Sequence, residues 1–174
     1  MIDIINVKQV AAILYQDRAD YDAVNAELTS IYSKIDFEGE FFPFVETDYY
    51  ESEMGKDLHR GMISFQKLVH PEQLAASKIK AREFEDGLRE NGNRRINVDI
   101  GYMDMFKVVL ASFKGRSNKI YLADGVWADM IMYFEEGDYK TFVWGFPDFK
   151  SGIYNKDLIK IRNLYKSQLR DLKK

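Results

Sequence analysis

Segments with helical periodicity alternate with strand-like runs in this sequence, and their order limits the folds open to it. The run "VKQVAAILY" predicts a buried strand over Val7–Tyr15, and apolar residues three and four apart predict a helix in "RADYDAVNAELTSIYSK". Two extended runs, "IDFEGEFFPFV" and "LHRGMISFQKLV", precede a second helix in "HPEQLAASKIKAREFEDGLRENG". Pro71 suits the first turn of that helix, and "NGN" ends it.

The second half of the chain adds strands and one more helix. The extended runs are "RRINVDI", "FKVVLASF", "NKIYL" with "VWADMIMYFEE", and "DYKTFVWGF", and the "EEGD" turn joins the last two as a hairpin. A final helix carries an apolar stripe of Leu158, Ile161, Tyr165, Leu169 and Leu172. This order predicts an α+β fold, a mainly antiparallel mixed sheet with helices packed on one side. Its start fits a ferredoxin-like βαββαβ unit, followed by extra strands and the C-terminal helix.

Composition sets the broad class of the protein. A length of 174 residues favours one domain over 1–174. The chain contains no cysteine, which excludes disulfides, thiolate nucleophiles and cysteine-based metal sites. No apolar run reaches the roughly 18 residues of a spanning helix, and the N-terminus lacks the features of a signal peptide. We therefore expect a cytoplasmic protein without a membrane segment.

Charge is distributed unevenly along the chain. The formal net charge of −3 argues against nucleic acid as a partner. Residues 36–57 carry eight acids and one lysine, whereas residues 150–174 carry eight Lys or Arg and two Asp. These two segments either pair with each other or leave the basic terminal helix to bind a protein partner.

Several common catalytic and nucleotide-binding motifs are absent. There is no phosphate-binding G-x-x-x-x-G-K-[ST] loop, and both "NKIY" and "NKDL" lack the aspartate that reads guanine. Of the two histidines, His70 is expected to cap the helix that follows it, and His59 is expected at the surface. Neither has the spacing of a zinc ligand.

The acidic and aromatic stretch "VETDYYESEMG" is a first candidate for a site. It is either a solvated turn or one wall of a ligand site. In the second case a flat ligand would stack on a tyrosine, and the candidate residues are Thr47, Tyr49, Tyr50 and Glu53.

The strand "RRINVDIGY" is a second candidate, because Arg95, Asn97 and Asp99 alternate with apolar residues. A solvent-facing strand would show the same pattern. In a site, Arg95 would clamp a phosphate or carboxylate, and Asp99 would bind a hydroxyl or Mg²⁺. Gly101 leaves room for a ligand or a neighbouring backbone, and Tyr102 completes the set.

Further candidates are charged residues in apolar surroundings. Lys78 and Glu85 fall on or beside the apolar face of the second helix, where they pair with each other or border a cleft. Asp148 follows an aromatic run and either caps a turn or joins the site, and Lys114 adds a cation. A shared site requires Glu53, Arg95, Asp99 and Asp148 to converge.

Together, "FPFVETDYYESEMG", "RRINVDIGY", "NKIYLADGVWA" and "WGFPDF" resemble a bacterial family known only as domain-of-unknown-function family 4416. The resemblance covers nearly the whole chain, and "TDYYESEMG" is its most specific part. The chain departs from the family pattern at Val98 and Ile100, at Ala81-Arg82 in the long helix, and at Asn118-Lys119. Some relatives carry a GTP-binding label, which the missing motifs do not support here.

The sequence leads to two functional hypotheses. In the first, the protein binds a small polar or phosphorylated, nucleotide-like ligand in a cleft lined by acidic, Tyr and Arg residues, with no reaction assigned. In the second, it is a non-catalytic protein-interaction module. No cofactor is predicted, and Mg²⁺ is the metal ion that oxygen ligands of this kind would hold.

Overall fold

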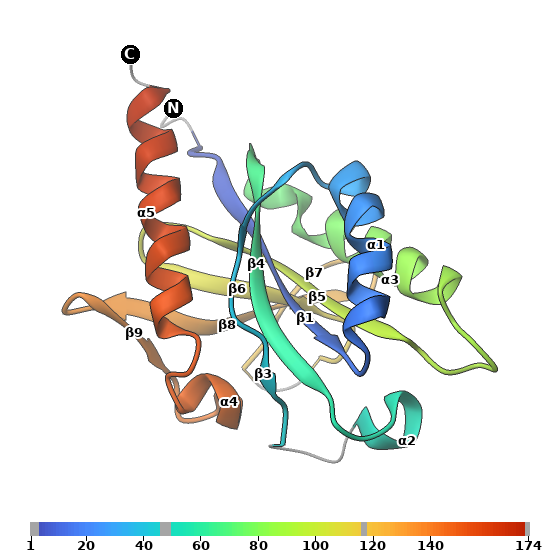
Figure 1. The fold of residues 1–174 in the computed structure, drawn as a ribbon. Coiled ribbons are helices and arrows are strands. Elements are labelled where there is room, and N and C mark those ends of the chain that lie inside the picture. Colours follow the sequence, from blue (N-terminus) through green and yellow to red (C-terminus); the bar gives the residue numbers. More distant parts are fainter. Residues whose placement is uncertain (1–3, 46–49, 116–117, 173–174) are drawn as a thin grey trace.

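The computed structural model describes residues 4–45, 50–115 and 118–172, which form a nine-stranded sheet with helices on both faces (Figure 1). The strands are β1 (Val7–Tyr15), β2 (Ile35–Glu38), β3 (Phe42–Pro43), β4 (His59–Val69), β5 (Ile96–Met103), β6 (Lys107–Ser112), β7 (Ile120–Ala123), β8 (Val126–Glu135) and β9 (Asp138–Thr141). The helices are α1 (Arg18–Ile31), α2 (Glu51–Met54), the 3-10 turn η2 (Pro71–Gln73), α3 (Leu74–Gly87), α4 (Pro147–Lys150) and α5 (Asn155–Asp171).

The strand order confirms the α+β fold. It is β2-β4-β1-β5-β6-β8-β7, with β3 beside β4 and β9 beside β8. The first four strands in this order, with α1 and α3, reproduce the arrangement of a ferredoxin-like βαββαβ unit. Every strand pair among the described residues is antiparallel.

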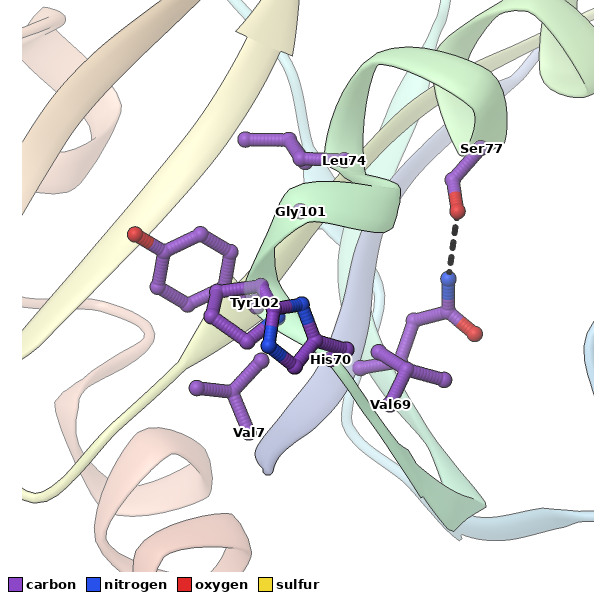
Figure 2. A pocket seen from close by; sticks show the side chains of 9 residues that line it. Val7, Val69, His70, Leu74, Ser77, Gly101 and Tyr102 are labelled. Carbon is purple, nitrogen blue, oxygen red and sulfur yellow. Dashed lines mark hydrogen bonds between the residues drawn. The ribbon is translucent and has the colours of Figure 1, made fainter. Parts of the chain in front are cut away.

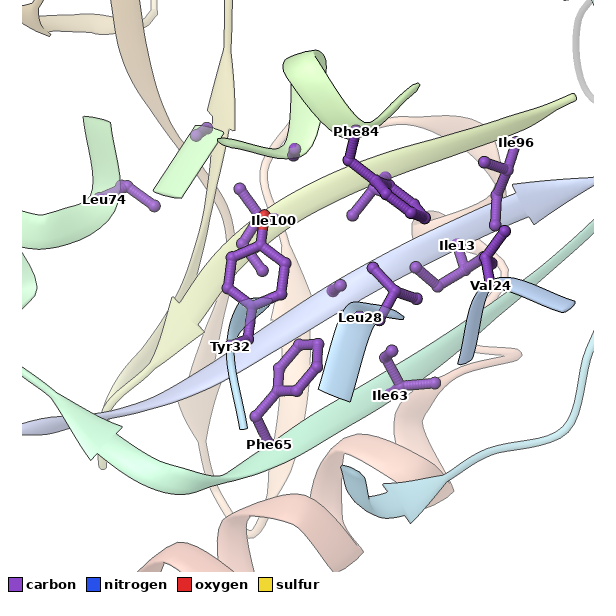
Figure 3. Close-up of a cluster of buried hydrophobic side chains, with 14 of the residues drawn as sticks. Ile13, Val24, Leu28, Tyr32, Ile63, Phe65, Leu74, Phe84, Ile96 and Ile100 are labelled. Carbon is purple, nitrogen blue, oxygen red and sulfur yellow. The ribbon is translucent and has the colours of Figure 1, made fainter. Parts of the chain in front are cut away.

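The face of the sheet under α1 and α3 holds the larger hydrophobic core (Figure 3). Leu28 of α1 and Phe84 of α3 pack against Ile13 of β1, and the rings of Tyr32 and Phe65 lie 5.0 Å apart. The spacing of apolar residues in α1 predicted its buried side correctly. At the start of η2, His70 accepts a hydrogen bond from the Glu72 N–H at 3.4 Å, which confirms its capping role.

The opposite face is also covered, so the helices do not all lie on one side. Phe149 of α4 and Leu158 and Ile161 of α5 pack on Val10 and Met62 of the central strands. Figure 1 shows α5 well apart from α1 and α3. The physical reason is that β1 is buried along its whole length and is apolar on both faces from Val10 onward, which requires a cover on each.

The acidic segment and the basic terminal helix do not neutralise each other among the described residues. Asp36 pairs with Lys8 of β1, and Glu38 pairs with Arg18 of α1. The side chain of Lys8 also donates to Gln168 of α5 at 2.9 Å. The polar contacts of α5 therefore help to anchor the helix to the sheet.

A fork opens in the sheet between β5 and β6. Within these two strands, residue pairing runs only from Gly101 to Met103, and the earlier part of β5 lies beside α3 instead. Gly101 sits where the fork closes, and an added Cβ there would overlap the backbone oxygen of Val109 and lie 3.0 Å from the Cα of Leu110. Its role as a glycine is therefore to admit a neighbouring backbone.

We expect Gly101→Ala to destabilise the fold by about 1–3 kcal/mol, because the methyl group would push β6 away from β5. Gly87→Ala is the matched control, since its Cβ would meet nothing within 4 Å and alanine favours the helix. Urea unfolding of both variants measures the difference. Equal free energies of unfolding for Gly101→Ala and the wild type would contradict the close approach.

Candidate functional site

Strand register places Arg60 of β4, and Asn97 and Asp99 of β5, on the face covered by α4 and α5. Arg60 of β4 lies opposite Leu14 of β1, which lies opposite Asn97 of β5. Asp99 occupies the next row on that face, beside Ala12. The side chains of Arg60 and Asp99 meet across β1, where Leu14 and Ala12 lie between them.

Arg60 is a buried cation held between two carboxylates. Its Nη1 donates to Asp148 Oδ2 at 3.0 Å and its Nη2 donates to Asp99 Oδ2 at 3.2 Å. Its guanidinium also lies over the rings of Phe44 and Phe149, at 5.5 Å and 5.1 Å. Burial opposes the charge of Arg60, but Asp148 and Asp99 outweigh that effect and raise its pKa.

Asp99 is shared between Arg60 and Lys78. Lys78 Nζ donates to Asp99 Oδ1 at 3.3 Å and to the carbonyl oxygen of Val98 at 2.9 Å. Burial alone would raise the pKa of Asp99, but Lys78 and Arg60 hold it below its ordinary value. Its side chain keeps 21% of its surface exposed. We call Arg60, Lys78, Asp99 and Asp148 the Arg60 cluster.

Lys78 and Glu85 of α3 fill the fork in the sheet. Glu85 Oε1 accepts from the N–H of Val98 at 2.6 Å, while Lys78 binds the carbonyl of the same residue. These side chains take the place of a neighbouring strand for Val98, whose backbone groups would otherwise be buried without partners. Burial raises the pKa of Glu85 above its ordinary value. Lys78 and Glu85, which the sequence analysis named as site candidates, therefore also satisfy the backbone groups of Val98.

Asp148 has one carboxylate oxygen in use and one without a partner among the described residues. It lies in the first turn of α4, where Pro147 starts the helix. Its Oδ2 accepts from Arg60 and from the Tyr154 hydroxyl at 3.1 Å. Its Oδ1 is buried and makes no hydrogen bond within the described part of the chain, although the residue is only 5% exposed. A buried carboxylate oxygen of this kind has an unused capacity to accept a hydrogen bond.

The short helix α2 lies over one side of the Arg60 cluster. Its Met54 packs on Leu14, in a small core that includes Phe44 and Tyr50. Burial is the main cause that raises the pKa of Tyr50 to about 12, and the negative charge of Asp99 is the second. Figure 1 shows α2 and α4 at the same end of the sheet, on either side of β3.

Glu53 of α2 connects this helix to the residues that precede β5. Its carboxylate accepts from Arg94 Nε at 2.9 Å and Nη2 at 2.7 Å, and from Arg89 Nη1 at 3.0 Å. Arg94 also donates to Asn97 Oδ1 at 2.8 Å and to Glu85 Oε2 at 3.3 Å. Arg94 thus links Glu53 of α2 to Asn97 of β5 and Glu85 of α3.

The structure brings most of the predicted site residues to one end of the sheet. They are Tyr50, Glu53, Lys78, Glu85, Asn97, Asp99 and Asp148. Thr47 and Tyr49 lie outside the described residues. Lys114 is exposed in the loop after β6, where its backbone N–H donates to Ser112 Oγ at 3.0 Å.

Arg95 does not converge with the other members of the site. It precedes the first residue of β5 and turns to α1, where its Nε donates to Asp20 Oδ2 at 3.1 Å, and it also pairs with Glu90. The alternation of β5 therefore does not extend to it. Its neighbour Arg94 occupies the position that the sequence analysis gave to Arg95.

Tyr102 lies on the opposite face from Asp99, because it is three residues further along β5. Figure 2 shows it beside Val7 and His70, near the hydrogen bond of 3.0 Å between Gln9 and Ser77. The hollow there has about 10 Å³ of space, which is room for one water molecule at most. Tyr102 therefore lies away from the Arg60 cluster.

Three residues of the site were missed by the sequence analysis, namely Arg60, Arg94 and Tyr154. Arg60 shares a strand face with Met62, so a charge among apolar residues was the signal that could have found it. His59, expected at the surface, instead stacks on Tyr15 at 6.0 Å, with its Nδ1 buried.

Within the described ranges, no three Asp, Glu or His side chains converge as metal ligands do. Arg60 and Lys78 neutralise the carboxylates Asp99 and Asp148 in this structure.

In the described part of the chain, no helix has the length and apolar character needed to cross a bilayer.

The fold and the site define an α+β protein with a ferredoxin-like half and a buried charge cluster at one end of its sheet. Among known families, the chain matches the model described as "Domain of unknown function (DUF4416)" over residues 5–165. The chain belongs to this family. No curated protein and no solved structure matches it.

Proposed function

We propose that the protein binds a small polar ligand at the Arg60 cluster, through hydrogen-bond donors that reach Asp148 and Asp99. The observation that carries the proposal is the buried Asp148 Oδ1, which has no partner in the described part of the chain. Leaving such an acceptor unused costs roughly 1–3 kcal/mol, and a bound donor recovers that energy. The partial exposure of Asp99 gives the ligand a second contact.

The chemistry of the cluster favours ligands that donate hydrogen bonds over ligands that bring a phosphate. Arg60, Lys78 and Arg94 are each committed to a carboxylate, so they offer little to a phosphate group. Arg95, the expected phosphate clamp, is paired with Asp20. Hydroxyl and amino groups of sugars, polyols or the sugar part of a nucleotide fit the unused acceptor.

The absence of cysteine accords with action in the cytoplasm.

The test is a thermal-shift screen with sugars, amino sugars, nucleosides, nucleotides and Mg²⁺, followed by two isosteric variants. A ligand at 100 times its Kd stabilises by roughly 2.7 kcal/mol. Asp148→Asn replaces the unused acceptor with a donor and is expected to abolish the shift. In Asp99→Asn, one oxygen becomes an amide nitrogen, but both oxygens of Asp99 already have protein partners, so we expect the shift to persist in weaker form.

The same screen includes GTP and ATP with Mg²⁺. We expect no larger shift with GTP, because the sequence lacks a guanine-reading motif. If the ligand response is intact in Asp148→Asn, the ligand does not bind through Asp148 and its site lies elsewhere.

A second candidate function is binding to a protein partner. It is favoured by an exposed apolar loop after β9, in which Val143 is 86% exposed and Trp144 and Phe146 are exposed as well. Such binding would be lost in Trp144→Ser and retained in Asp148→Asn. The two variants therefore separate the two functions.

A further inference from the structure

The position of α2 bears on access to the Arg60 cluster. The helix lies on the small core formed by Leu14, Met54 and Leu58, apart from the two larger cores. Tyr50 precedes it and lies close enough to Asp99 and Arg60 for their charges to act on its hydroxyl. A ligand that approaches the cluster from this side therefore meets α2 first.

The C-terminal end of α2 has the backbone of a hinge. Gly55 has φ 85° and ψ −171°, a combination that is essentially restricted to glycine. An added Cβ at Gly55 would also lie 2.8 Å from Gln16 Nε2. Asp57 follows with φ 60°. Gln16 Nε2 donates to the carbonyl of Lys56 at 3.0 Å and fixes this turn to the end of β1.

The other attachment of α2 is electrostatic. Glu53 pairs with Arg94 and Arg89, and these are the ion pairs of α2 within the described residues. The Glu53 side chain is 31% exposed, so salt screens these pairs more than it screens the buried pairs of Arg60. Breaking them removes the ion pairs of α2 and keeps its hydrophobic contact with the small core.

We propose that α2 is a hinged cover of the Arg60 cluster, closed by the ion pairs of Glu53, and that its opening controls entry to the cluster. This regulatory role rests on the proposed function, because the cluster must receive a ligand for entry to matter. The partially exposed ion pairs make opening sensitive to ionic strength. The buried contacts of Arg60 stay in place while the cover moves.

The experiment compares Glu53→Gln with the matched control Glu51→Gln in the full chain. Glu51 lies in the same helix, is exposed, and has no ion pair in the described ranges. Hydrogen exchange of residues 51–58 is expected to be about tenfold faster in Glu53→Gln and unchanged in Glu51→Gln. Sodium chloride at about 1 M, where the Debye length is about 3 Å, should speed exchange in the wild type and the control but not in Glu53→Gln.

Entry is measured by coupling glycinamide to Asp148 with a water-soluble carbodiimide, followed by peptide mass spectrometry. Labelling of Asp148 should accelerate in Glu53→Gln in parallel with exchange in α2. Faster exchange without faster labelling would overturn the role in entry, and equal exchange in all three proteins would overturn the hinge. Neither readout uses a ligand, so a failed ligand screen would count against the proposed function alone.

Discussion

Arg60→Met is expected to destabilise the protein by about 3–5 kcal/mol, as found when one partner of a buried ion pair is removed. The variant keeps most of the side-chain volume but leaves Asp148 without its cation and Asp99 with Lys78 alone. This loss is a large part of the roughly 5–15 kcal/mol that stabilises a typical domain. Urea unfolding at pH 7 measures it.

The pH dependence of the same variant tests the cause. The pKa of Asp99 is lower in the folded wild type than in the unfolded chain, so its ion pairs stabilise the fold above a pH of about 4 and lose that effect as the pH falls. The difference between wild type and Arg60→Met should therefore be largest near pH 7 and shrink toward pH 3. Arg82→Met, at an exposed pair with Asp86, is the control and should cost less than about 1 kcal/mol. A pH-independent difference would point to lost packing instead of unpaired charge.

Truncation after Asn155 is expected to prevent stable folding. It removes Leu158, Ile161 and Tyr165, which are fully buried, and exposes Val10 and Met62 beneath them. Each large apolar side chain contributes about 1.5–3 kcal/mol through burial, so the summed loss approaches the stability of a whole domain. Circular dichroism and thermal melting of the purified fragment provide the measurement.

A shorter truncation serves as its control. Removal of residues 172–174 takes away Leu172, which is 72% exposed, and should leave the melting temperature unchanged. If the longer truncation also melts like the full chain, α5 is an appendage and its anchoring contacts, including the bond from Lys8 to Gln168, contribute little.

The sequence predicted those parts of the fold that depend on local periodicity. The helices α1 and α3, the hairpin between β8 and β9, and the buried residues of α5 follow from apolar spacing and turn residues. Leu172 extended the predicted stripe too far, since it is 72% exposed, whereas Leu169 is half-buried. The cover of the second face was missed because a stripe on a helix does not tell which face of a sheet it packs on.

The candidate site depended on contacts that periodicity does not encode. Lys78 and Glu85 were found because charge on an apolar helix face demands a partner. Arg60 was missed because its partners lie 39 and 88 residues away along the chain. Arg95 was assigned to the site and Arg94 was overlooked, because alternation does not show at which residue a strand begins.

The fork between β5 and β6 also determines where the sheet is mechanically compliant. A continuous ladder resists torsion because each residue pair adds a rung, whereas these two strands share rungs only from Gly101 to Met103. We therefore expect torsion between the ferredoxin-like half and the outer strands to concentrate at this seam, two residues from Asp99. A molecule bound against Asp99 would lie beside this seam, on the β5 side of the fork.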